Sequence, residues 1–145
     1  MRKAFALLLL LACGSATLSA AAQAPESGEL VVHATGFANA RGHAVAKLFV
    51  AGDNVLEAGR WQRLAPIEAG AVTLRFSDLL AGSYAVVVFH DLNDNLAIDH
   101  GLFGPSEPLG FSGGFALSWL SGRPDFARLQ FDFKPPVQTL TVRVK

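Results

Sequence analysis

Cysteine and charge are what this chain of 145 residues has least of. It holds one cysteine, Cys13, so no disulfide can form within the chain. Asp, Glu, Lys and Arg make up 17% of the residues, and the formal net charge is zero. Soluble domains are typically about a quarter charged. The neutral balance argues against nucleic-acid binding, because such binding needs a basic face to displace counterions. The length fits one domain and rules out a multidomain assembly.

The longest apolar run lies at the N-terminus. Met1-Arg2-Lys3 is followed by an apolar core from Ala4 to Ala12 and then by small residues, among them Ala20-Ala21-Ala22. A short basic region, an apolar core and A-x-A cleavage options predict a secretory signal peptide over residues 1–22, with cleavage near 22–24. A membrane-spanning helix needs roughly 20 apolar residues, so this core is too short. We expect a periplasmic or extracellular protein with no transmembrane span.

Cys13 leaves an alternative open. Leu10-Leu11-Ala12-Cys13 resembles a bacterial lipobox, in which the cysteine is lipidated and becomes the mature N-terminus. That processing would make the protein an outer-membrane lipoprotein. With cleavage near 22–24 instead, the mature chain has no cysteine, and its stability must come from its core or from a bound ion.

From Glu29 onward the apolar residues alternate with a period of two, which is typical of strands with one buried face. Two further runs are apolar on both faces, which suits central strands. Turn signals separate the runs, and no strong amphipathic helix is present; single helical turns are expected within 55–64 and 115–120. The strands are expected near residues 30–35, 44–50, 72–76, 84–89, 128–133 and 139–144.

An antiparallel sheet with one apolar face must bury that face against another layer. Residues 25–145 are therefore predicted to form an all-β domain, a single antiparallel β-sandwich of about seven strands. Tyr84, the only tyrosine, opens the most apolar strand. A buried tyrosine hydroxyl needs a partner, and sandwich corners often supply a backbone group. We interpret Tyr84 as structural.

The most informative segment follows that strand and reads His90-Asp91-Leu92-Asn93-Asp94-Asn95-Leu96-Ala97-Ile98-Asp99. Four of its side chains fall at positions 1, 3, 5 and 9 of a calcium-loop pattern, and a backbone carbonyl at position 7 would add a fifth oxygen. An all-oxygen set favours calcium over zinc or copper. The candidate ligands are Asp91, Asn93, Asn95, Ala97 and Asp99, together with Glu107 if the chain folds back.

The match to a calcium loop is incomplete. Position 6 is normally Gly, for a sharp turn, and position 12 is normally a bidentate Glu. Here these positions are Leu96 and Leu102. The alternative interpretation is an Asx-rich loop, in which Asp and Asn side chains bond their own backbone.

Two other hypotheses concern the surroundings of this loop. A hydrolase could use His90 with Asp91 or Asp99 near Glu107, although no serine elbow or glycine-rich phosphate loop accompanies them. The apolar residues of the long segment that follows either pack it against the core, which we favour, or form a binding lip. They are Leu102, Phe103, Leu109 and Phe111.

These residues carry a resemblance to a known family. Gly82-Ser83-Tyr84-Ala85-Val86, the His90–Asp99 run, Gly104, Glu107 and Gly110-Phe111-Ser112 resemble domain of unknown function family 2141, a group of small exported bacterial proteins. The resemblance implies a periplasmic or secreted β-sandwich of the transthyretin-like or immunoglobulin-like kind, and it implies no established activity. Asp94 and Leu96 stand where the family tends to have Gly, and Leu109 stands where an aromatic is usual.

The sequence thus predicts an exported, non-enzymatic binding or structural module with a candidate calcium-binding loop at residues 91–99. Its partner is expected to be an unidentified protein or another envelope component.

Overall fold

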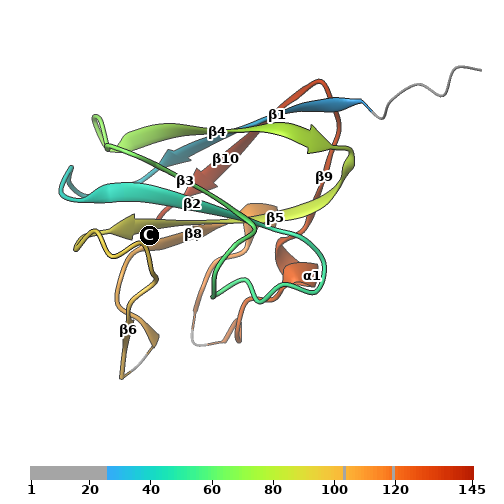
Figure 1. Cartoon of the computed structure of the whole chain (residues 1–145). Helices are drawn as coiled ribbons and strands as arrows, with labels where there is room; N and C mark the ends of the chain where they lie inside the picture. The colour runs from blue at the N-terminus through green and yellow to red at the C-terminus, as the bar shows by residue number, and fades with distance from the viewer. Residues whose placement is uncertain (1–25, 103, 119) are drawn as a thin grey trace, which may run out of the picture.

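The structure is a computed structural model that describes residues 26–102, 104–118 and 120–145 (Figure 1). The predicted signal peptide, its cleavage sites and Cys13 lie outside these residues. Within them, none of the helices has the length and apolar character that crossing a membrane requires. The described chain is mostly β, as predicted, with very little helix.

One layer is a three-stranded sheet in the order β10-β1-β4, formed by Val137–Arg143, Ser27–Thr35 and Ala71–Leu80. All described strand pairs are antiparallel, as expected, except β1 with β10, which is parallel. The reason lies in connectivity. The chain enters β10 from β9, which belongs to the other layer, and not through a hairpin from β1. Parallel neighbours need such a long crossover.

The second layer is a five-stranded sheet. Its central strands are β2 (His43–Phe49) and β5 (Gly82–Asp91), flanked by β3 (Trp61–Ala65) and β8 (Leu109–Phe111). The start of β5 also pairs with β9 (Phe131–Phe133). A small hairpin of β6 (His100–Gly101) and β7 (Gly104–Pro105) stands apart.

Two predictions of local structure are wrong. Trp61–Ala65 is an edge strand paired with β2, and not a helical turn; its W-Q-R-L-A pattern does not alternate cleanly, so only the pairing reveals it. The expected turn at 115–120 is absent from the described part of that segment. Helical turns occur instead at η1 (Ser112–Gly114) and α1 (Phe126–Leu129). The Asp125 side chain caps α1 by accepting the Arg128 N–H, which shortens the predicted strand 128–133 to β9.

Two hydrophobic clusters explain why some strands alternate between apolar and polar residues and others are apolar on both faces. One lies between the sheets, and β1, β4 and β10 contribute one face each to it. The other lies on the outer face of the five-stranded sheet, where the chain on either side of β8 covers it (Figure 1). This covering segment comprises residues 93–102, 104–108, 112–118 and 120–130. The central strands β2 and β5 are therefore buried on both faces, as their sequences predict. The outer cluster comprises Val45, Phe49, Val55, Ala85, Val87, Phe89, Ile98, Leu109, Phe111 and Leu129.

Tyr84 has the structural role expected of it. Its ring is buried in the cluster between the sheets, and its hydroxyl donates to the Leu80 carbonyl at 3.0 Å. That bond closes the turn between β4 and β5.

Candidate functional site

The site begins where β5 ends, and its first residue is structural. His90 is only 1% exposed, and its Nε2 donates to the Arg41 carbonyl at 2.7 Å. The ring meets Phe37 edge to face, with 5.5 Å between the ring centroids. With this nitrogen occupied and the ring buried, His90 offers no accessible base to the hydrolase hypothesis.

Asp91 is the first residue of the loop and anchors it. Its carboxylate is buried, and its two oxygens accept the Asn95 N–H at 3.2 Å and the Leu96 N–H at 2.8 Å. These bonds curl the chain back on itself within five residues. The turn before β2 packs closely here: a Cβ added at Gly42 would lie 1.9 Å from the Asp91 carbonyl oxygen. Only glycine fits at that contact.

The polar side chains of positions 3, 5 and 9 converge. Asn93 Nδ2 donates to Asp99 Oδ2 at 2.7 Å, and Asn95 Nδ2 donates to Asp99 Oδ1 at 2.8 Å. The amide oxygens serve local turns, because Asn93 Oδ1 accepts the Asn95 N–H and Asn95 Oδ1 accepts the Ala97 N–H. The contacts of the Asx-turn interpretation are therefore present.

Glu107 folds back onto the loop. Its Oε1 accepts the Leu92 N–H at 3.0 Å and its Oε2 accepts the Asp99 N–H at 3.4 Å, while the side chain is buried. The Ser106 N–H also donates to the Asp99 carbonyl at 2.8 Å. Glu107 thus ties the two ends of the loop together.

The loop contains two non-glycine residues in the left-handed region, Asp94 with φ 59° and Leu96 with φ 61°. Leu96 therefore adopts the sharp turn that position 6 of a calcium loop needs, although its side chain opposes that conformation. Asp94 projects outward, and its Oδ1 lies 2.6 Å from His43 Nδ1.

The electrostatics of the loop involve few ionisable groups. In the described part of the chain, no three His, Cys, Asp or Glu side chains stand together as a ready metal cage. A cation at this loop would therefore depend on amide and backbone oxygens as well as on carboxylates. The nearest buried cation is Lys47 on β2, whose pKa is lowered by burial, while the charge of Asp91 acts in the opposite direction.

Sequence reasoning did not identify Lys47 or the role of Ser112. Lys47 lies on the outer face of β2, with Nζ 5.0 Å from the centroid of the Phe89 ring. Its signal was visible, because it is the one charge inside an apolar run. Ser112 Oγ donates to the Leu129 carbonyl at 2.6 Å and accepts the Val86 N–H at 2.8 Å, which fastens the covering segment to β5.

The other motif residues near Ser112 also have packing roles. A Cβ at Gly110 would lie 2.7 Å from the Arg143 carbonyl oxygen, so β8 and β10 approach each other only with glycine there. Phe111 and Leu109 are buried in the outer cluster, as the packing interpretation predicts. The packing interpretation is wrong for Leu102, which is almost fully exposed because it lies in the turn that follows β6, and Phe103 lies outside the described residues.

Comparison with known proteins identifies the family. No curated protein and no solved structure matches the chain. The family model described as "Uncharacterized protein conserved in bacteria (DUF2141)" matches residues 32–141, which include the whole loop and most of both sheets. The chain therefore belongs to this family of uncharacterised bacterial proteins.

Proposed function

We propose that the protein is exported and acts as a non-enzymatic binding or structural module whose loop at residues 91–99 binds calcium. One observation carries the proposal. Asp91, Asn93, Asn95 and Asp99 converge in a loop whose sixth position is left-handed, and Glu107 folds back beside them. Positions 1, 3, 5 and 9 thus carry side chains that calcium loops use, and Glu107 offers a carboxylate in place of the Glu that is normally at position 12.

Calcium binding requires an exchange of partners within the loop. The amide nitrogens of Asn93 and Asn95 now donate to the two oxygens of the Asp99 carboxylate. Rotating both amides about their terminal bond would replace these NH₂ groups with oxygens and leave both Asp99 oxygens for the ion. The exchange gives up four hydrogen bonds: the two from the amide nitrogens to Asp99 and two local turn bonds, at the Asn95 and Ala97 N–H groups. The turn bonds contribute about 0.5–1.5 kcal/mol each and the bonds to the carboxylate about 1.5–3 kcal/mol each, and calcium coordination has to exceed their sum.

Thermal unfolding of the purified protein in EDTA and in excess calcium tests the proposal. An ion that binds only the folded state at 100 times its dissociation constant adds about 2.7 kcal/mol, or about 10 °C for a domain of this size. Asp99→Asn should abolish that rise, because it removes the charge at position 9. Asp94→Asn is the matched control: it removes an acid of the same loop that points outward, so the rise should remain.

A wild-type protein with the same unfolding temperature in EDTA and in calcium would refute the calcium site. A rise that Asp99→Asn leaves intact would place the ion elsewhere.

The cellular location follows from the N-terminus in this proposal. Cleavage near 22–24 would release the protein into the periplasm or medium, whereas lipidation of Cys13 would anchor it. A mass spectrum of the mature N-terminus separates the two outcomes. The two-layered arrangement is proposed to be a variant of the transthyretin-like or immunoglobulin-like sandwich, and the partner to be another envelope component.

A further inference from the structure

A cleft opens along one side of the molecule, where an edge of each sheet meets the other. β8 and β10 approach there, and the backbones of Leu109 and Lys145 exchange two hydrogen bonds of 3.1 Å. The cleft has a volume of about 390 Å³. That volume is in the range of small-molecule sites in proteins, about 300–1,000 Å³.

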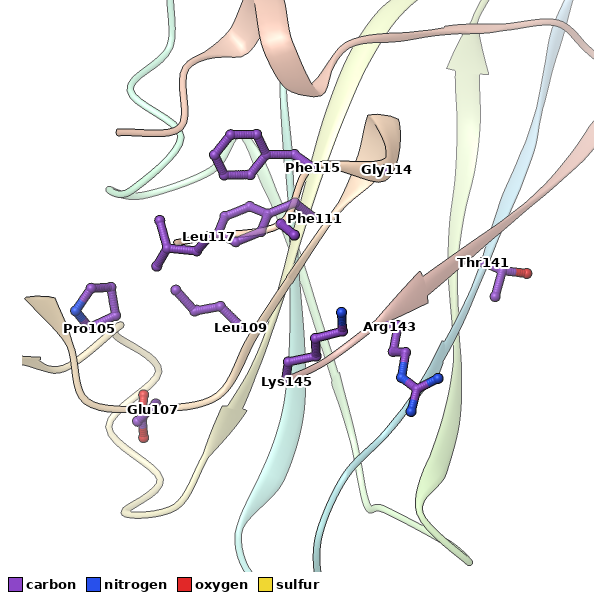
Figure 2. Close-up of a pocket in the computed structure, with 11 residues that line it drawn as sticks. Pro105, Glu107, Leu109, Phe111, Gly114, Phe115, Leu117, Thr141, Arg143 and Lys145 are labelled. Carbon is purple, nitrogen blue, oxygen red and sulfur yellow. The ribbon is translucent and has the colours of Figure 1, made fainter. Parts of the chain in front are cut away.

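One wall of the cleft is apolar and partly aromatic (Figure 2). Phe111 and Phe115 meet edge to face, with ring centroids 5.3 Å apart. The Arg128 guanidinium lies over the Phe115 ring, 4.7 Å from its centroid. Leu109 continues this wall, and Leu117 stands at the mouth with 43% of its surface exposed. The wall is therefore a fixed apolar surface that solvent still reaches.

The other side of the cleft is cationic. Arg143, the last residue of β10, and Lys145 both line it and are exposed. Figure 2 shows Lys145 next to Leu109 and Arg143 farther from the apolar group. Neither takes part in an ion pair among the described residues. Glu107 is the one acid in the lining, and both of its oxygens already accept backbone N–H groups of the loop. The two cations are thus available to a ligand.

We infer that this cleft binds a small organic acid, with an aromatic or aliphatic body against Leu109, Phe111 and Phe115 and a carboxylate on Lys145 and Arg143. The pairing is chemical: an apolar body would cover the exposed surface of the wall, and the carboxylate would accept charge-assisted hydrogen bonds from the two cations. The inference gives a ligand class to the binding role proposed above. It uses different residues from the calcium ligands, apart from Glu107.

The test is a titration of the purified protein in EDTA with three probes of one shape. They are 4-phenylbutyrate, the uncharged 4-phenylbutan-1-ol and the cationic 4-phenylbutylamine. Calorimetry and the amide NMR shifts of Leu109 and Lys145 measure the binding of each probe. The acid should bind most tightly and the amine most weakly. EDTA removes calcium, so a failure of the calcium proposal leaves this result readable by itself.

Variants assign the binding to the cleft. Lys145→Glu should weaken the acid about tenfold or more, because one charge-assisted bond is lost and a repulsion replaces it. Leu117→Asn should weaken the acid and the alcohol alike, because it removes apolar contact without adding charge. Lys134→Glu is the control, since it makes the same change of charge on an exposed lysine that does not line the cleft.

Three results would overturn the inference. They are no binding of the acid, equal binding of the acid and the alcohol, and an equal loss of affinity in Lys145→Glu and Lys134→Glu.

Discussion

The left-handed conformation of Leu96 makes a measurable prediction about the loop. For an L-residue, this backbone conformation costs about 1–2 kcal/mol, whereas glycine adopts it freely. Leu92 is a matched site in the same loop: it is 39% exposed against 42% for Leu96, and it is not among the residues with positive φ. Replacing each leucine by Ala and by Gly removes similar side-chain contacts at both sites. The comparison of Gly with Ala then isolates the backbone.

At residue 92, Ala should be more stable than Gly by about 0.5–1 kcal/mol, the usual entropic cost of glycine. At residue 96 the order should reverse, with Gly more stable by about 0.5–1 kcal/mol, because relief of strain exceeds that entropic cost. The entropic part cancels in the difference between the sites, which should be about 1–2 kcal/mol. Urea unfolding in EDTA measures all four variants. If Ala is the more stable residue at both sites, Leu96 is not strained and the argument fails.

Three further predictions concern buried polar groups. Ser112→Ala should lower the free energy of unfolding by about 2–4 kcal/mol, because it leaves the Val86 N–H and the Leu129 carbonyl buried without their partner. In the same denaturant titration, Ser118→Ala, at an exposed site, should change the free energy of unfolding little. Tyr84→Phe should cost about 1 kcal/mol through the lost bond to Leu80, and an unchanged stability would remove its structural role. Burial lowers the pKa of Lys47, so the unfolded chain binds a proton there more readily than the folded protein does. The free energy of unfolding should therefore rise with pH toward the ordinary lysine value of 10.5. Unfolding curves over a pH series should show a smaller rise for Lys47→Met, and an equal rise would contradict this reasoning.

The fold was predictable for strands that bury only one of their two faces. Leu30, Val32 and Ala34 in β1 point into the cluster between the sheets, and period-two alternation predicts this directly. The central strand Gly82–Asp91 was predictable for the opposite reason, because it is apolar on both faces. The parallel partner of β1 was not predictable, since alternation identifies the buried face of a strand but not its neighbour. The edge strand Trp61–Ala65 lacks alternation, because half-exposed edges accept mixed residues.

The candidate site was predictable as a list of residues but not as a network. Spacing placed Asp91, Asn93, Asn95 and Asp99 in one loop, and the structure brings them together. Spacing could not show that Asn93 and Asn95 present nitrogens to Asp99, because a side-chain amide can be turned either way. The return of Glu107 depends on its bonds to the N–H groups of Leu92 and Asp99, and spacing along the chain does not specify such partners.

The family motif has a common physical purpose, which is to fasten the covering segment onto the central strand β5. The His90 N–H donates to the Pro108 carbonyl, Glu107 binds the N–H of Leu92, and Ser112 bonds to Val86. Each contact joins the covering segment to β5 or to the residue that follows it, and none leaves a reactive group facing solvent. A motif of this kind specifies a scaffold. The specificity of the proposed ligand cleft would then depend on side chains outside the motif, Leu117 and Lys145 among them.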